Sequence, residues 1–291
     1  MKKLLGVLLG ASVFTLTACS KQQAPDSDAA QAKNSGELQT VTLASTGSDA
    51  DIWRYIATLP ETKQAGLKLD VKNFTDYVAM NTAVANKEID LNAFQSYAYM
   101  VAYNDANTQK IAPLATTYLE PMGIYSSKVK SLDEFKTGAT IAIPNDGANE
   151  SRALLLLQSA GLVKLKPEFD YVKGTTADVT ENAKQIVIKP IQMATAVRVK
   201  DEVDAIVLGN TLAMEGGLNV LKDAIYYEPI DQSTKMNVNV LAVAADRQND
   251  PALQKVGALY HTPAVKAYVD EHLGGTKVAV NKPVTYLTEA Q

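Results

Sequence analysis

The chain has 291 residues, of which 46% are hydrophobic and 21% are charged, with 16 Gly and 11 Pro. This composition is typical of globular proteins and excludes collagen-like, coiled-coil and wholly disordered chains. The net charge of −4, without a long basic segment, argues against nucleic acid as a partner. A single cysteine and two histidines argue against a disulfide framework, a metal site and a metal cofactor. We therefore expect neither metal nor cofactor.

The first residues predict export and lipid anchoring. Lys2 and Lys3 precede an uncharged, largely apolar stretch over 4–16. This stretch is shorter than the roughly 20 residues that span a bilayer, so it resembles the core of a signal peptide. The sequence LTAC that follows resembles a bacterial lipobox, in which Cys19 would carry the lipid. The alternative is a plain signal peptide that is followed by a cysteine. We expect a cell-envelope protein, anchored to a membrane through lipid, with its globular part periplasmic or extracellular; which membrane holds the anchor stays open.

From Val41 onward, short β-rich runs alternate with helical patterns, which predicts an α/β fold. The expected strands are VTLAS (41–45), LKLDVKNF (67–74), IDLNAF (89–94), ATIAIP (139–144), IVIKPI (186–191) and VDAIVL (203–208). Helices are expected over 49–65, 77–87 and 149–160 and near 195–200, with a possible short strand at 172–173. A short echo, KEID at 87–90 and DEVD at 201–204, indicates two similar units, although chance similarity is the alternative.

Two further strand-like segments lead from one unit to the other and back. They are MGIYS (122–126) and NVNVLAVAA (237–245), and two helices are expected after Pro251. Two crossings at one junction form a hinge, and ligands of α/β sheets bind beyond the carboxyl ends of strands. We predict a two-lobe fold like that of periplasmic binding proteins, with two crossover strands at the hinge and a ligand cleft between the lobes. The predicted domains are a signal peptide (1–18), a lipidated tether (19–39), lobe 1 (40–122 plus 240–291) and lobe 2 (123–239).

An arginine in an unusual position marks a candidate site. In IPNDGANESRALLLLQSAGL, Asn149 is the expected N-cap of a helix and Arg152 lies in its first turn. A cation there opposes the positive end of the helix dipole, which suggests a function. Together with free backbone N–H groups, the guanidinium would bind a carboxylate. The alternative is a surface arginine paired with Glu150 or Asp146.

Aromatic and amide side chains near predicted strand ends are further candidates. The aromatic ones, which would enclose an apolar ligand side chain, are Trp53, Tyr77, Phe94, Tyr97 and Tyr118. The amides of Asn210 and Asn239 could accept from an ammonium and donate to a carboxylate. Core packing for the aromatic residues, and turn or strand-end caps for the asparagines, are the alternatives.

Four motifs resemble the NlpA/MetQ family of methionine-binding lipoproteins, the substrate-binding components of ABC importers. They are FTDYVAMNTAVANKEIDLNAFQ (74–95), EPMGIYS (120–126), KSLDEFKTGATIAIPNDGANESRALLLLQSAGL (130–162) and the NVLAV run from 239. The resemblance implies a monomer that binds a free amino acid, methionine or a related one, between two α/β lobes. It also implies delivery of that amino acid to a membrane permease and its ATPase.

By this resemblance, the ligand-binding positions are Tyr77, Phe94, Asn149, Arg152, Asn210 and Asn239. Arg152 would hold the α-carboxylate, the asparagines would orient the two charged groups, and the aromatic rings would enclose the side chain. Further candidates for ligand contact are Asp49, Trp53, Ser96, Tyr97, Tyr118 and Asn145. Three of these, Asp49, Ser96 and Tyr118, stand where the family commonly has His, which changes the polarity expected of the pocket.

No catalytic residue is expected, because the sequence has no GxSxG nucleophile motif and lipidation would consume the thiol of Cys19. Two other classes of function remain. One is an enzyme that uses paired carboxylates, although scattered acidic residues are normal on solvated helices. The other is a surface lipoprotein with an adhesion or interaction role and an altered or vestigial pocket.

Overall fold

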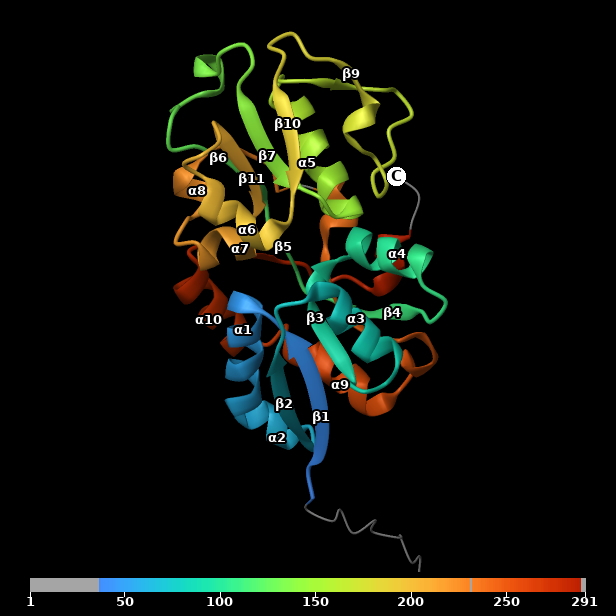
Figure 1. Cartoon of the computed structure of the whole chain (residues 1–291). Coiled ribbons are helices and arrows are strands. Elements are labelled where there is room, and N and C mark those ends of the chain that lie inside the picture. Colours follow the sequence, from blue (N-terminus) through green and yellow to red (C-terminus); the bar gives the residue numbers. More distant parts are fainter. Residues whose placement is uncertain (1–36, 231, 289–291) are drawn as a thin grey trace, which may run out of the picture. The chain divides into compact units, whose positions relative to one another are not determined.

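The computed structural model describes residues 37–230 and 232–288 (Figure 1). The predicted signal peptide, the lipidation site Cys19 and nearly all of the tether lie outside these residues. The described chain forms two five-stranded sheets flanked by helices, which confirms the α/β prediction. Among the described helices, none combines the length and the apolar character needed to cross a membrane.

The first sheet has the strand order β2-β1-β3-β13-β4. Its strands are β1 (Gln39–Ser45), β2 (Leu67–Asn73), β3 (Leu91–Ser96), β4 (Ile111–Thr116) and β13 (Asn239–Ala244). β1 runs parallel to β2 and β3, whereas β13 runs antiparallel to β3 and β4. In this register Asn239 lies opposite Ser96, so the start of β13 and the end of β3 share one edge of the sheet.

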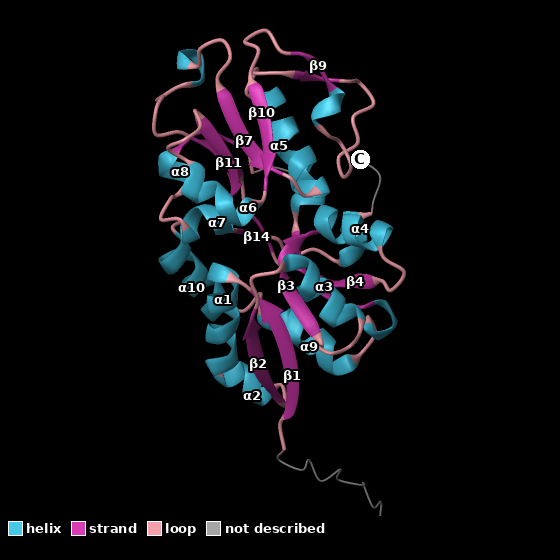
Figure 2. Ribbon diagram, in the orientation of Figure 1, coloured by secondary structure: helices cyan, strands magenta, loops and turns pink. Residues whose placement is uncertain are grey.

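Helices cover both faces of the first sheet (Figure 2). They are α1 (Gly47–Thr58), α2 (Pro60–Gln64), α3 (Tyr77–Ala85), α4 (Tyr97–Ala106), α9 (Pro251–Leu259) and α10 (Pro263–Leu273). Alternate residues of β13 face opposite ways: Leu241 packs in the core with α1, α9 and α10, and Val240 packs in the core with α3 and α4. This two-sided burial explains why the sequence of β13 is apolar throughout.

The helix predicted over 49–65 is interrupted at Leu59, so the prediction of one continuous helix was wrong. Leu59 has an extended conformation (φ −67°, ψ 143°), and α2 begins at the next residue, Pro60. Proline has no backbone N–H and disfavours helical conformation in the residue before it, so the chain stops one helix and starts another.

The second sheet has the strand order β10-β7-β11-β6-β12. Its strands are β6 (Met122–Tyr125), β7 (Thr140–Pro144), β10 (Val187–Ile191), β11 (Ala205–Gly209) and β12 (Ala224–Tyr227). β7 is parallel to β10 and β11, and β6 is antiparallel to β11 and β12. Residues of α5 (Gly147–Ser159) pack on one face. The other face is covered by α6 (Met193–Ala196), α7 (Asn210–Glu215) and α8 (Val220–Asp223).

Two small sheets complete the described strands. β5 (Tyr118–Leu119) pairs with β14 (Val278–Ala279), and β8 (Lys164–Leu165) pairs with β9 (Val179–Glu181). The short strand predicted at 172–173 is wrong, because this segment is a turn. There the Asp170 carboxylate accepts the N–H groups of Val172 and Lys173 at 2.8 and 2.9 Å, the pattern of an Asx-turn.

The chain passes from the first sheet to the second between β4 and β6 and returns between β12 and β13. The predicted crossing segments, 122–126 and 237–245, contain β6 and β13, each an antiparallel strand of its sheet. The lobe limits drawn from the sequence stay a prediction. Both connections between the sheets end beside one pocket, at Glu120 and at Asn239.

Candidate functional site

A pocket is formed by residues from the strand ends and helices of both sheets. From the first sheet and its helices come Thr46, Tyr77, Phe94, Gln95, Ser96, Tyr99 and Asn239. From the second come Asn149, Arg152, Met193, Gly209, Thr211 and Leu212, and Glu120 joins them from the connection between β5 and β6. The empty volume is about 540 Å³, including the open mouth.

Three aromatic rings form the apolar wall of this pocket. Tyr77 begins α3, Phe94 lies in β3, and Tyr99 lies in the first turn of α4. Their ring centroids are 5.1 Å (Tyr77 to Phe94), 5.9 Å (Phe94 to Tyr99) and 6.3 Å (Tyr77 to Tyr99) apart. These tilted and edge-on contacts are favourable and hold the rings in place. With Met193 and Leu212 across the pocket, they suit an apolar ligand side chain.

The N-terminus of α5 supplies polar groups, but not with the cap that the sequence predicted. Asp146, and not Asn149, is the N-cap: its carboxylate accepts the backbone N–H of Asn149 at 3.2 Å and the side-chain Nδ2 at 2.8 Å. The N-cap therefore lies three residues earlier than predicted. Asn149 falls in the first turn, where its side chain lines the pocket and its Oδ1 makes no hydrogen bond to the described residues.

Arg152 is buried, with 8% exposure, and forms an ion pair with Glu228. Nε donates to Oε1 of Glu228 at 2.9 Å, and Nη2 donates to Oε2 at 2.5 Å and to the backbone oxygen of Glu120 at 2.8 Å. The alternative of a surface arginine paired with Glu150 or Asp146 is therefore wrong. Burial acts to lower the pKa of Arg152, but Glu228 outweighs it, so the pKa is raised and the guanidinium stays charged. Nη1 has no hydrogen-bond partner among the described residues.

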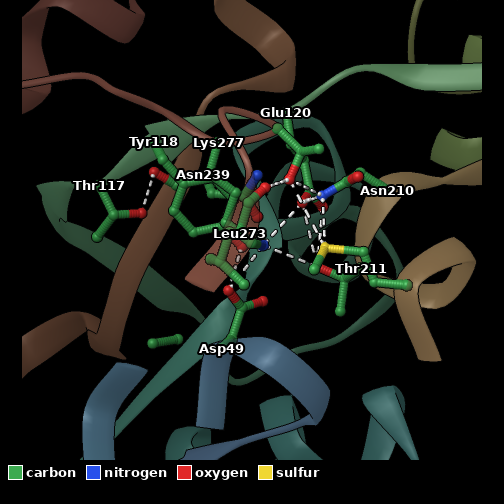
Figure 3. Close-up of polar contacts among 12 residues, drawn as sticks. Asp49, Thr117, Tyr118, Glu120, Asn210, Thr211, Asn239, Leu273 and Lys277 are labelled. Atoms are coloured by element: carbon green, nitrogen blue, oxygen red, sulfur yellow. Dashed lines mark hydrogen bonds and ion pairs between the residues drawn. The ribbon is translucent and has the colours of Figure 1, made fainter. Parts of the chain in front are cut away.

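A second buried ion cluster, drawn in Figure 3, includes Glu120 and Thr211 of the pocket lining. Nζ of Lys277 donates to Oδ1 of Asp49 at 3.0 Å, to Oε2 of Glu120 at 2.7 Å and to Oγ1 of Thr211 at 2.8 Å. The Tyr118 hydroxyl donates to the same Oδ1 of Asp49 at 2.7 Å, and the Tyr118 ring centroid lies 4.0 Å from the ammonium. Within 37–230 and 232–288, no group of His, Cys, Asp or Glu side chains is arranged to hold a metal ion.

The two carboxylates of this cluster differ in their surroundings. Burial raises the pKa of Asp49, and its second oxygen, Oδ2, is buried without a hydrogen-bond partner among the described residues. Burial acts in the same direction on Glu120, but Lys277 and the donors around it outweigh burial and lower its pKa. These donors include Nδ2 of Asn210 at 3.0 Å. The carboxylate that lines the pocket, Glu120, is therefore the one held in its charged form.

Most of the predicted binding residues meet at the pocket. Tyr77, Phe94, Asn149, Arg152 and Asn239 line it, as does the further candidate Ser96. The Ser96 hydroxyl also caps α4, because it accepts the backbone N–H of Tyr99 at 3.2 Å.

Other candidates lie elsewhere. Asn210 is fully buried behind Glu120 and also donates to Thr276 at 3.1 Å. Asp49 and Tyr118 belong to the lysine cluster. Trp53 packs in the core against Tyr260, Tyr97 packs in the core cluster of α3 and α4, and Asn145 is exposed.

Three charged residues of the site were missed at the sequence level: Glu120, Glu228 and Lys277. Glu120 opens the EPMGIYS motif and directly follows an apolar pair, which is a signal that could have been used. Glu228 similarly ends the apolar run of β12. Lys277 lies outside any periodic segment, and its partners are 157 and 228 positions away in the sequence, so no local pattern points to it.

Comparison with known proteins places the chain in a family. The model of the family described as NlpA lipoprotein matches residues 41–281. Outer membrane lipoprotein 2 of Mannheimia haemolytica is 37% identical over 266 residues, which cover 91% of this chain and 93% of the relative. A probable D-methionine-binding lipoprotein MetQ of Pasteurella multocida is 32% identical over 277 residues, covering 94% and 97%. A nutrient binding protein from Burkholderia cenocepacia, solved bound to methionine, superposes with a TM-score of 0.78 at 33% identity and covers 82% of this chain and 99% of its own. The resemblance and the binding-protein fold predicted from the sequence are thus confirmed, and the chain belongs to the NlpA lipoprotein family.

Proposed function

We propose that this chain is the lipid-anchored substrate-binding component of an ABC importer. It binds a free amino acid, methionine or a close relative, in the pocket between the two sheets and delivers it to a membrane permease. It acts by binding and not by catalysis. Lipid on Cys19 would hold it at a membrane of the cell envelope.

The observation that carries this proposal is the division of the pocket into an apolar half and a polar half. Three aromatic rings, Met193 and Leu212 surround one part. Arg152, Glu120, Asn149 and Asn239 surround the other. An amino acid with an apolar side chain has the same division, because its ammonium and carboxylate lie at one end. The relative from Pasteurella multocida, described as a probable D-methionine-binding lipoprotein, and the Burkholderia cenocepacia protein solved bound to methionine support the same class of ligand.

The polar half offers groups for both charges of the ligand. We assign the carboxylate to Nη1 of Arg152 and Nδ2 of Asn239, since neither nitrogen bonds to another described residue and both side chains line the pocket. We assign the ammonium to Glu120 and to Oδ1 of Asn149. Charge-assisted hydrogen bonds of this kind are the strong ones in proteins, and the surrounding burial keeps water from competing.

Small molecules released from the purified, denatured protein, analysed by mass spectrometry, test the proposal directly. Calorimetry with a panel of free amino acids, including both enantiomers of methionine, then ranks the ligands. We expect an apolar amino acid among the released molecules and saturable binding of one or a few members of the panel. If no amino acid is released and none binds, the transport role fails, and a surface lipoprotein with a vestigial pocket becomes the better interpretation.

A further inference from the structure

The buried charges around the pocket do not balance. The cations are Arg152 and Lys277, and the carboxylates are Asp49, Glu120 and Glu228. Each of these five residues is at most 9% exposed. Arg152 is matched one to one by Glu228, through three hydrogen bonds to its carboxylate oxygens. Lys277 alone faces both Asp49 and Glu120. The site therefore holds one carboxylate more than it holds cations.

An excess buried charge is costly, so it attracts a compensating group. In the lysine cluster the excess is apparent at Asp49, whose Oδ2 is buried without a hydrogen-bond partner in the described part of the chain. Burial also raises the pKa of Asp49, which reflects the cost of a second charged carboxylate beside a single ammonium. The carboxylate of this cluster that reaches the pocket surface is Glu120.

In the same polar half of the pocket, the guanidinium of Arg152 has little net charge to offer, because Glu228 pairs with it. Nε and Nη2 of Arg152 are engaged by Glu228 and by the backbone of Glu120, which leaves Nη1 for a ligand. The Glu228 carboxylate is held in turn by the backbone N–H of Met122 at 2.9 Å, so it cannot move away easily. A ligand carboxylate thus meets a neutral ion pair, whereas a ligand ammonium meets an uncompensated negative cluster.

We propose that the ammonium is the group that this pocket chiefly recognises, with Glu120 as its partner and Asp49 as the source of the excess charge behind it. The ligand class is then apolar amino acids together with their carboxyl-blocked amides, and the corresponding carboxylic acids that lack the amino group are excluded. The inference rests on the proposed function in that it places the same kind of ligand in the same pocket. Asp49 acts here as a positioning residue, because it does not line the pocket.

The first test compares three probes by calorimetry on the wild-type protein, in a methionine series and a leucine series. The probes are the free amino acid, its carboxyl amide and the deaminated acid that lacks the amino group. We expect the amide to bind within about tenfold of the amino acid, and the deaminated acid to bind roughly a hundredfold more weakly or not at all. A deaminated acid that binds as tightly as the amide, or more tightly, would overturn the inference. Binding of the amides without binding of any free amino acid would contradict the proposed function but not this inference. Binding of none of the probes would contradict both.

The second test uses Asp49→Asn, which removes the excess charge without touching the ligand. We expect the preference for the amide over the deaminated acid to fall about tenfold. The matched control is Asp90→Asn, the same change of charge at the start of β3, the end of that strand opposite to the pocket, where Asp90 is paired with Arg247. The control should leave the preference unchanged. If Asp49 had only a structural role, its variant would weaken all probes in the same proportion, which would contradict the proposal. We expect Glu120→Gln to lower the preference for the amide over the deaminated acid as well. This variant provides the test if Asp49→Asn does not fold.

Discussion

Asn239 places a side-chain amide in the lining of the pocket. It is the first residue of β13, it is 5% exposed, and its side chain makes no hydrogen bond to the rest of the described chain. Its backbone oxygen, by contrast, is held by the N–H and the hydroxyl of Thr117 at 2.9 and 3.0 Å. The backbone therefore stays in place when the side chain is changed, which makes Asn239 a clean probe of ligand binding.

We predict that Asn239→Ala weakens binding of the amino acid about tenfold or more, because a hydrogen bond to a charged group contributes roughly 1.5–3 kcal/mol. Calorimetry measures the loss, and urea denaturation should show the free energy of unfolding within about 1 kcal/mol of wild type. Asn145→Ala is the control, since Asn145 is exposed and outside the pocket. Equal affinities of both variants and the wild type would exclude Asn239 from the site.

Arg152 is a poorer probe of ligand binding than Asn239. Arg152→Ala leaves the Glu228 carboxylate buried without its cation, and breaking a buried pair in this way costs about 3–5 kcal/mol of stability. Loss of binding in that variant would then report on folding as much as on ligand contact. A change in the partner-free side chain of Asn239 avoids this ambiguity.

At the scale of elements, Asp90 ties together β1, the start of β3 and the helical turn that follows β13. Its carboxylate accepts the N–H and the hydroxyl of Thr42 in β1, each at 2.8 Å, and Nη1 of Arg247 at 2.6 Å. Burial alone would raise the pKa of Asp90, but the hydrogen bonds from Arg247 and Thr42 outweigh it and lower the pKa. The folded state thus keeps this carboxylate charged at a lower pH than the unfolded chain does.

The lowered pKa of Asp90 makes the stability of the fold depend on pH. The contribution of Asp90 to stability is complete above its pKa in the unfolded chain, about 3.9. It is lost as the pH falls through the lower pKa that Asp90 has in the folded state. We predict that Asp90→Asn reduces the free energy of unfolding by about 1–2 kcal/mol at neutral pH, allowing for the partial exposure of the pair. The difference from wild type should shrink as the pH falls below the unfolded value. Urea denaturation at several pH values measures this, and a difference that does not change with pH would show that the charge of Asp90 does not stabilise the fold.

The elements themselves could largely be read from the sequence. Strands such as β7 and β11 are short apolar runs that end at Pro or Gly, and α10 begins at Pro263 and ends before Gly274, whose φ is +56°. Errors arose where a single residue decides the local conformation. Pro60 splits the first helix, and Asp170 folds the segment after it into a turn. In such places a proline ring, or an aspartate that accepts hydrogen bonds from nearby backbone N–H groups, outweighs the pattern of apolar residues.

The site was predictable only in part, for a related reason. Tyr77 and Phe94 of the first sheet and Arg152 of the second stand next to recognisable strand ends and helix starts, where ligands of α/β sheets bind, so the sequence could mark them as candidates. Lys277 and Glu228 acquire their roles through partners far away in the sequence. Such pairings depend on how the two sheets approach each other, which no local periodicity encodes.

At the scale of the whole molecule, a close contact between α1 and α7 joins the parts that carry the two sheets. Gly47 starts α1 with φ +48°, and a Cβ atom there would lie 1.9 Å from Oε1 of Glu215 at the end of α7. Two separate constraints therefore require glycine: the left-handed backbone conformation and the space that the Glu215 side chain occupies.

We predict that Gly47→Ala lowers the free energy of unfolding by about 1 kcal/mol for the backbone conformation, with a further loss from displacement of Glu215. In a Glu215→Ala background only the first loss should remain. Urea denaturation of the four proteins in a double-mutant cycle separates the two terms. Identical losses in both backgrounds would show that the Glu215 side chain yields at no cost and that the contact between α1 and α7 does not depend on it.

The position of Lys277 has a consequence for the time at which the site can form. This lysine is residue 277 of 291, yet it is the cation that sits between Asp49 and Glu120. A chain without Lys277 would have to bury those two carboxylates without the ammonium that lies between them. The buried ion cluster beside the pocket can therefore form only after the chain has folded through Lys277.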